Sequence, residues 1–274
     1  MKTLLAIHEV DEDLGGLKKL INIASHANAH LNIVVLGVVR VVPMTAAPGV
    51  PDFYFSETNR EMIEAGQKRV DEIEQLVAEE NLSATVTLEC RDPALIEQTI
   101  LRHALFCDAT VFMSKSVLSN DLRTRAFNGA LLDTGTPILV LGKDAETLPT
   151  INSILIAWNG EPEAAKAVHE SLHWIDGEAD VHIAIVDPDE YVHGPNPGDD
   201  LAAYLSRRGL KVTVDRLAGG RRNVSDVLLE HANDINADMM VMGAYGHSRL
   251  REWLLGGTTR NVLEKAEIPV MMAH

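Results

Sequence analysis

The sequence contains little of what marks a disulfide-bonded, metal-thiolate or membrane protein. Only 2 cysteines, Cys90 and Cys107, occur in 274 residues, and no Cys-x2-Cys or other metal-ligand spacing includes them. Such cysteines are typical of reduced core residues, so we expect a cytoplasmic protein. No stretch approaches the ~20 apolar residues of a membrane helix. The apolar run after Met1 stops before His8, which is too short for a signal peptide.

Basic residues are scarce relative to acidic ones. The chain has 24 Lys and Arg against 40 Asp and Glu, which gives a formal net charge of −16. Nucleic acids and anionic membranes are bound through basic surfaces, so we expect neither as a partner. Aromatic residues make up only 4% of the chain, whereas 46% is hydrophobic. This composition indicates a soluble globular protein whose core consists of aliphatic and methionine side chains.

The signatures of several enzyme classes are also absent. The chain has no Gly-x4-Gly-Lys-Ser/Thr loop, no Gly-x-Gly-x2-Gly and no Gly-x-Ser-x-Gly, and we assign no catalytic residue. Histidines form two i, i+4 pairs, which are His26 with His30 and His169 with His173. Because no Glu or Cys completes a zinc set beside them, solvated or capping roles are favoured. His182 and His193 could join His8 or an acid, but we expect no metal site.

Apolar strand patterns alternate with helical patterns along the whole chain. In the first half we predict strands at 3–7, 31–42, 84–90, 109–113 and 138–141, with helices at 14–24, 57–80, 93–104 and 123–132. In the second half we predict strands at 153–158, 181–186, 211–217, 239–242 and 270–273, with helices at 164–174, 200–207, 224–235 and after 257. The proline-rich segment 43–55 is interpreted as a mobile loop or lid. The alternation predicts α/β, doubly wound parallel sheets with helices on both faces.

The second half repeats the first. Residues 91–113 overlie 221–243 without gaps, and the segment 136–141 matches 268–273. We therefore predict two repeated α/β domains, at 1–143 and 150–274, joined by the polar segment 143–152. Strands Ile138–Leu141 and Val270–Ala273 are expected to pair and to make a pseudo-dimer within the chain.

A glycine-rich segment follows the fourth strand of the second half. After Met242 come Gly243, Gly246 and then, nine residues later, Gly256-Gly257-Thr258-Thr259 at the start of a helix. Glycines let a backbone approach a ligand, and the N–H groups of a helix start favour an anion. Two tight turns with a helix cap explain the same spacing. The position after a parallel strand favours phosphate binding.

The first half lacks these glycines. The counterparts of Gly243 and Gly246 are Met113 and Ser116, and no double glycine precedes the helix at Arg123. We therefore expect a ligand site in the second half alone.

This segment resembles the Gly-x2-Gly-x9-Gly-Ser/Thr motif of the universal stress protein family, and the duplication makes the chain similar to a tandem member of that family. The resemblance implies an adenine-nucleotide-binding fold with five parallel strands per domain, in which the last strand mediates pairing between domains. The backbone of Ile185 or Val186 would meet the adenine edge. The implied cofactor-binding residues are Ala157, Trp158, Asn159, Val186, Met242, Gly243, Gly246, Gly256, Gly257, Thr258 and Thr259. To these we add His247 and Arg249 from the intervening loop.

Two positions depart from the family pattern. The acid expected after the first strand is replaced by Asn159, and in the first half by His8. Gly257 stands where the family has Ser or Thr. Loss of a hydrogen bond to a charged group lowers affinity about ten- to a hundred-fold. Trp158 could stack on adenine or pack between helices.

The function implied by this resemblance is that of a cytoplasmic stress-response regulatory or protective protein. Its C-terminal domain would bind ATP or another adenine nucleotide, with Mg or Mn as an accompanying ion. Its protein partner is unknown, and a homodimer is left open. One alternative is a slow ATP hydrolase or phosphoryl-transfer enzyme that uses Asp187 or Asp189. The other is an interaction scaffold that binds no nucleotide.

Overall fold

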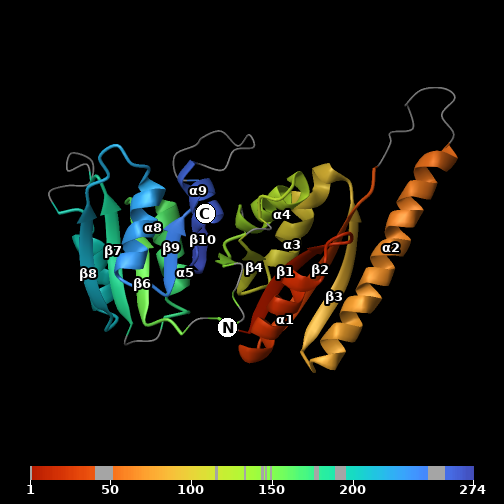
Figure 1. Cartoon of the computed structure of the whole chain (residues 1–274), viewed down its shortest axis with the longest axis horizontal. Helices are drawn as coiled ribbons and strands as arrows, with labels where there is room; N and C mark the ends of the chain where they lie inside the picture. Colours follow the sequence, from red (N-terminus) through yellow and green to blue (C-terminus); the bar gives the residue numbers. More distant parts are fainter. Residues whose placement is uncertain are drawn as a thin grey trace. The chain divides into compact units, whose positions relative to one another are not determined.

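We analysed a computed structural model of the chain (Figure 1). The structure describes residues 2–40, 52–114, 117–132, 134–142, 145, 147–148, 150–175, 179–188, 196–245 and 257–274. The chain divides into two compact units. One comprises Met1–Val111, Leu118–Thr134 and Glu146–Leu148, and the other comprises Phe112–Val117, Gly135–Ala145 and Pro149–His274. In the described residues no helix is both long and apolar enough to span a membrane.

The first unit is a parallel sheet with strand order β3-β2-β1-β4. β1, β2 and β4 are mostly buried apolar segments, as expected for a parallel sheet that is covered by helices, whereas β3 is mostly half-buried. The elements, in chain order, are β1 (Thr3–Glu9), α1 (Gly15–His26), β2 (His30–Val38), α2 (Asp52–Glu79), β3 (Ala84–Arg91), the 3-10 turn η1 (Pro93–Leu95), α3 (Ile96–Ala104), β4 (Ala109–Met113) and α4 (Asp121–Leu131).

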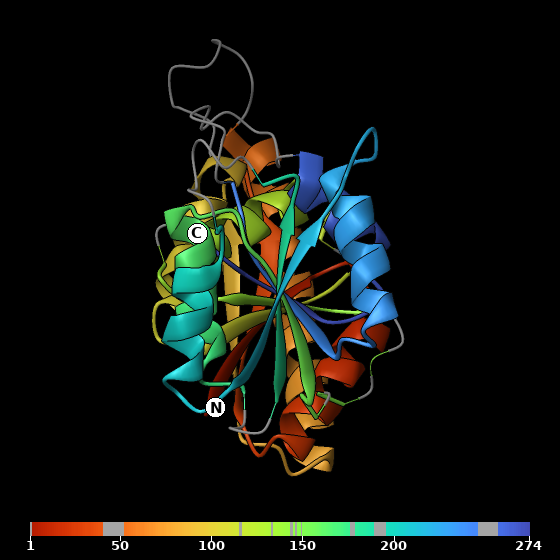
Figure 2. The ribbon, with the colours of Figure 1, turned by 90° about the vertical axis from the view of Figure 1, so that its left-hand side faces the viewer.

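The second unit has strand order β5-β10-β9-β6-β7-β8. Figure 2 shows α5 and α7, in green and teal, on one side of these strands and α8, in blue, on the other. The elements are β5 (Ile138–Leu141), β6 (Ser153–Ala157), α5 (Pro162–Ser171), β7 (Asp180–Val186), α7 (Asp199–Ser206), β8 (Lys211–Leu217), α8 (Val224–Asp234), β9 (Met239–Gly243), α9 (Gly257–Lys265) and β10 (Val270–Ala273). The predicted α/β class is confirmed.

The last strand of the first half belongs to the second unit. β5 pairs antiparallel with β10, so that Val140 lies opposite Val270 and Leu139 opposite Met271. All other pairings of the second unit are parallel. The predicted pairing of Ile138–Leu141 with Val270–Ala273 is therefore confirmed. Both strands are fully buried, which explains why neither carries a polar residue.

A pair of equivalent aspartates gives the sequence repeat a structural basis. Oδ2 of Asp108 accepts the amide hydrogens of Lys2 and Thr3 at 2.5 and 2.9 Å. Oδ2 of Asp238 accepts those of Asn152 and Ser153 at 2.7 and 2.9 Å. Each aspartate precedes the fourth strand of its half and anchors the start of the first strand.

Several predicted element ends shift. β2 ends at Val38 rather than at 42, and α2 begins at Asp52, inside the segment interpreted as a loop, whose residues 43–51 lie outside the described range. α5 ends at Ser171 rather than at 174. The end of α5 has no strong stop signal in the sequence, because neither Gly nor Pro marks it.

Candidate functional site

The strand order of the second unit reverses between β6 and β9. The chain leaves β6 to build β7 and β8 on one side, and it returns through β9 and β10 on the other. Ala157 lies opposite Met242 at the carboxyl ends of these two strands. Open α/β sheets bind ligands outside the carboxyl ends of the strands at such a switch point. The predicted residues of β6 and β9 are therefore brought together at this edge.

The turn after β6 places Trp158 and Asn159 at the same edge. The Trp158 amide donates to the carbonyl oxygen of Ala184 at 2.9 Å, which continues the β6–β7 ladder by one residue. Asn159 is exposed, and its Oδ1 accepts the Glu161 amide hydrogen at 3.2 Å in the turn that leads into α5. The Trp158 side chain is half-buried, so stacking on a ligand and packing against the protein both stay open.

Val186, the predicted neighbour of the adenine edge, ends β7 opposite Leu217 and is half-buried. The next residue, Asp187, has a positive φ of 47°. Its Oδ1 accepts the Gly219 amide hydrogen at 2.8 Å, so the carboxylate fixes the chain after β8. This contact gives Asp187 a structural role. Asp189 lies outside the described residues.

Gly243 is a glycine because α5 packs directly on it. A Cβ at this position would lie 2.6 Å from the backbone nitrogen of Ala164 and 2.8 Å from the carbonyl carbon of Glu163. No side chain fits against the backbone of a helix at that distance. The amide of Ala244, the following residue, already donates to Ala273 at 3.0 Å. Gly243 therefore brings the first turn of α5 close to the carboxyl end of β9.

The helix predicted after the third glycine of the motif begins at Gly257. Gly257 is exposed, and a Cβ there would meet no atom of the described residues within 4 Å. Thr258 is half-buried, whereas Thr259 is only 4% exposed. Thr258 thus offers the more accessible hydroxyl at this helix start. The predicted residues Gly246, His247, Arg249 and Gly256 lie outside the described residues, as does His193.

A buried acidic oxygen at this edge was not anticipated. Glu163 is in the first turn of α5, whose backbone contacts the Gly243 position, and its Oε2 is buried with no hydrogen-bond partner among the described residues. A buried acceptor without a partner carries a free-energy cost and calls for an explanation. The sequence shows a proline followed by an acid at the start of a helix, but it does not show that the Glu163 carboxylate oxygen is buried.

The equivalent edge of the first unit is filled by an ion-pair cluster. The strand registers pair Leu4 with Ala109 and Ile154 with Met239, and the repeat equates Ala109 with Met239. Glu9 is therefore the counterpart of Asn159. The expectation that His8 takes this place was wrong by one residue, because β1 continues for two residues beyond Ile7.

Arg123, from the start of α4, holds this cluster together. Its Nε lies 3.0 Å from Glu9 Oε1, its Nη1 donates to the Ile7 carbonyl oxygen at 2.8 Å, and its Nη2 contacts Glu12. The guanidinium is buried. His8 lies 3.3 Å from Glu12. Burial, with the positive charges of Arg69 and Arg123, lowers the His8 pKa from 6.5 to about 4.

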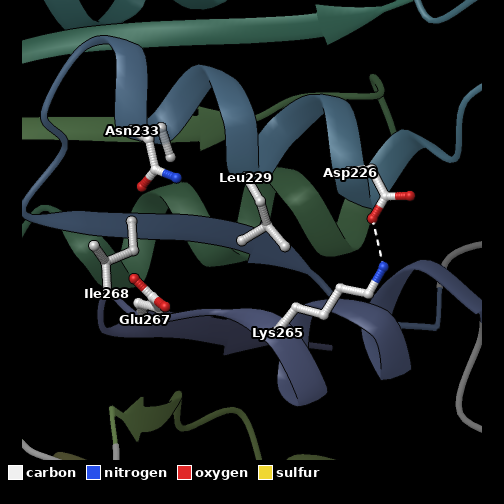
Figure 3. A pocket seen from close by; sticks show the side chains of 7 residues that line it. Asp226, Leu229, Asn233, Lys265, Glu267 and Ile268 are labelled. Carbon is white, nitrogen blue, oxygen red and sulfur yellow. Dashed lines mark hydrogen bonds and ion pairs between the residues drawn. The ribbon is translucent and has the colours of Figure 1, made fainter.

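The pocket drawn in Figure 3 lies elsewhere in the second unit. It is lined by α8, by the end of α9 and by Glu267 and Ile268, which precede β10. Lys265 Nζ is paired with Asp226 Oδ1 at 2.7 Å there. This pocket is therefore near the amino end of β10 and does not coincide with the switch point.

The second unit is thus an α/β domain with a switch point between β6 and β9. The start of α5 packs closely on the end of β9 there, and the glycine-rich segment leads into α9, which begins at Gly257. Residues 150–274 match the universal stress protein family. This half of the chain is therefore similar to that family, as the sequence resemblance indicated.

Two curated proteins and a solved structure illustrate the relationship. A universal stress protein of Synechocystis is 30% identical over 141 residues, covering 49% of this chain and 46% of that protein. The stress response protein NhaX of Bacillus subtilis is 35% identical over 59 residues, covering 22% of this chain and 34% of that protein. The matches thus span less than half of either relative. A universal stress protein from Archaeoglobus fulgidus has a TM-score of 0.68 at 17% identity, covering 98% of this chain and 97% of that one, which is a likeness in fold.

Proposed function

We propose that this protein is a nucleotide-responsive stress protein whose second unit binds an adenine nucleotide at the β6–β9 switch point, while its first unit binds none. The ligand would place its phosphates against the amides at the start of α9. The observation that carries this proposal is the contrast between two equivalent edges. The buried Arg123 ties the partly buried Glu9 and Glu12 into one cluster in the first unit, whereas the counterpart Asn159 is exposed.

Two features of the second edge suit a nucleoside phosphate. The N-terminus of α9 offers the backbone amides of a first helical turn and a positive dipole end, and Gly257 adds no side chain in front of them. Glu163 Oε2, which has no partner in the described part of the chain, is an acceptor for a sugar hydroxyl. Asn159 would serve as a weaker polar group where the family has an acid.

Calorimetric titration of the full chain with ATP, ADP and AMP tests the proposal. We expect one nucleotide per chain. A Gly257→Glu variant, which puts a carboxylate in the phosphate position, should abolish binding without disturbing the fold, because a Cβ at 257 meets nothing within 4 Å. Absence of heat and of a thermal shift with all three nucleotides would contradict the proposal and favour a scaffold.

The family hydroxyl can be restored by Gly257→Ser. Because one hydrogen bond to a charged group contributes on the order of 1.5–3 kcal/mol, we expect nucleotide affinity to rise about ten- to a hundred-fold. Gly257→Ala is the matched control, since it adds the same Cβ without the hydroxyl. Equal affinities for the serine and alanine variants would place the phosphates away from α9.

Phosphate release with Mg²⁺ or Mn²⁺ separates binding from hydrolysis. We expect no sustained turnover, because the Asp187 carboxylate is already bonded to the Gly219 amide. Turnover that Gly257→Glu abolishes would instead identify a hydrolase at the same site.

A further inference from the structure

Three metal-ligating side chains meet on the α8 face of the second unit. His182 Nδ1 lies 2.8 Å from Asp215 Oδ2, and His231 Nε2 lies 2.9 Å from the same oxygen. The three ligand atoms all lie within 4.8 Å of one another. The two imidazole rings are 6.3 Å apart and nearly perpendicular, at 75°. Two imidazoles therefore converge on one carboxylate oxygen.

The sheet register produces this convergence. Ala184 of β7 lies opposite Asp215 of β8, and His182, two residues earlier, points to the same face. α8 covers that face and contributes His231 from its last turn. The sequence separations conceal the cluster, because His182 and Asp215 are 33 positions apart and Asp215 and His231 are 16 positions apart.

The fold by itself does not require this cluster. The equivalent strands of the first unit pair Leu5 with Asn32 where the second unit pairs Leu155 with His182. Asn32 in turn lies opposite Thr85, as His182 lies opposite Thr213. The counterparts of His182 and Asp215 are therefore Asn32 and Thr87, and the gap-free repeat equates His231 with Leu101. The same fold is built in the first unit with none of the three ligands.

We propose that His182, Asp215 and His231 form a binding site for a divalent transition-metal ion of the zinc type, with water in the remaining coordination position. Imidazole nitrogen and carboxylate oxygen are suitable ligands for such ions. Three protein ligands leave a position open, as in sites where the metal contacts water or a small anion. Each neutral ring offers its lone pair once its proton resides on the other nitrogen.

The geometry and charge of the cluster suit this role. Metal–ligand bonds of ~2.0–2.2 Å in a tetrahedral site separate the ligand atoms by roughly 3.3–3.5 Å, so the two short contacts need to open by about half an ångström. The side chains are 22%, 19% and 17% exposed, which leaves an entry path from solvent. Burial alone would raise the pKa of the Asp215 carboxyl, but hydrogen bonds from His231 and His182 outweigh it and hold that pKa below its usual value. The carboxylate is thus ionised at neutral pH.

This site is independent of the nucleotide proposal. His182 is in the first half of β7, four residues before Val186, which corresponds to roughly 13 Å along an extended strand. Binding of a metal here can therefore be measured in the absence of nucleotide.

Competitive titration of the untagged, chelator-treated full chain with Zn²⁺ and a chromophoric chelator tests the site. We expect one Zn²⁺ per chain with micromolar or tighter affinity. Co²⁺ should give visible absorption of a low-symmetry nitrogen–oxygen site. The variants His182→Asn, Asp215→Thr and His231→Leu replace each ligand by the residue found at the equivalent position of the first unit. Each should weaken binding by at least about ten- to a hundred-fold, since even loss of an outer-shell partner costs that much.

The exposed pair His169 and His173 provides the control. α5 ends at Ser171, so these residues do not share one helix face, and the double variant His169→Gln/His173→Gln should retain full binding. The metal should raise the melting temperature of the wild type and of this control but not of the three cluster variants. Two results would each overturn the proposal: wild-type protein that binds no Zn²⁺ stoichiometrically, or cluster variants that bind as tightly as the wild type. If the cluster only holds α8 against the sheet, the wild type should bind no Zn²⁺ stoichiometrically, and the cluster variants should differ from it only in lower stability.

Discussion

Two glycines of the motif lie in opposite surroundings. The backbone of α5 lies against Gly243, whereas none of the residues that the structure describes lies within 4 Å of a Cβ at Gly257. The first glycine therefore sets the distance between a helix and a strand, and the second adds no side chain at the start of α9. Glycine thus meets two different requirements at these positions: close approach of a helix at 243 and the absence of a side chain at 257.

A Cβ at position 243 should destabilise the protein, whereas one at 257 should not. We expect Gly243→Ala to lower the free energy of unfolding by about 1–3 kcal/mol, because the clash is with backbone and α5 has to move. Gly257→Ala should stay within about 0.5 kcal/mol of the wild type. Urea denaturation of the two variants measures the difference. Equal midpoints would contradict the assigned packing role of Gly243.

His8 should make the stability of the protein depend on pH. Its pKa is about 4 in the folded state and 6.5 by default in the unfolded state. Between these values the unfolded chain binds more protons, so stability increases with pH and is lost as the pH falls from 6.5 towards 4. From pH 7 to pH 5 this linkage is worth about 2 kcal/mol.

Denaturation of wild type and His8→Gln at pH 7 and pH 5 isolates that contribution. The variant should lose about 2 kcal/mol less than the wild type over this range, because glutamine does not titrate. If both lose the same amount, His8 is not held neutral by burial beside Arg69 and Arg123.

At the scale of elements, β5 completes the second unit. It covers β10, which would otherwise be an edge strand with four buried apolar residues, Val270–Ala273. Exposed apolar edges pair with other chains. A polar segment separates β5 from β6 along the chain, but both strands belong to the sheet of the second unit.

A fragment of residues 150–274 should therefore associate through β10, whereas the full chain, in which β5 covers that edge, should not associate through it. Sedimentation of the fragment and of the full chain at equal concentration, with circular dichroism to establish that both fold, measures this. A folded, monomeric 150–274 fragment would show that β5 is not needed to cover the edge.

The strands were predicted more closely than the helices. β4, β5 and β10 have the predicted bounds, because short apolar runs between polar residues define a buried strand. β8 also has the predicted bounds, although it is not buried. Helix ends depend on packing against neighbours. α5 therefore ends three residues early, and the i, i+4 pair His169 and His173 does not lie on one helix. His26, in contrast, bonds the Asn22 carbonyl at the end of α1, as a capping residue does.

At the scale of the whole molecule, the two halves share a fold and differ in what fills the carboxyl edge. If only the second unit binds nucleotide, saturating ATP should protect amides there alone. At a hundred-fold excess over the dissociation constant the bound state gains about 2.7 kcal/mol. We expect slower hydrogen exchange in the second unit and no change in β1, β4 or α4.

Hydrogen exchange with and without ATP, analysed by mass spectrometry, measures this distribution. Gly257→Glu is the negative control and should remove the protection. Protection of β1 and α4 at the same nucleotide concentration would place a ligand in the first unit and contradict the role assigned to Arg123.

The sequence alone indicated the family resemblance, the α/β class, the internal repeat and the β5–β10 pairing. These features depend on local periodicity and on residue-by-residue repetition, both of which can be recognised in the amino-acid sequence. Only the tertiary structure decided that Glu9, not His8, matches Asn159, that Arg123 fills the first edge, and that His182, Asp215 and His231 meet. Those facts depend on strand register and on helix packing, which bring together residues that are far apart in the chain and leave no local pattern.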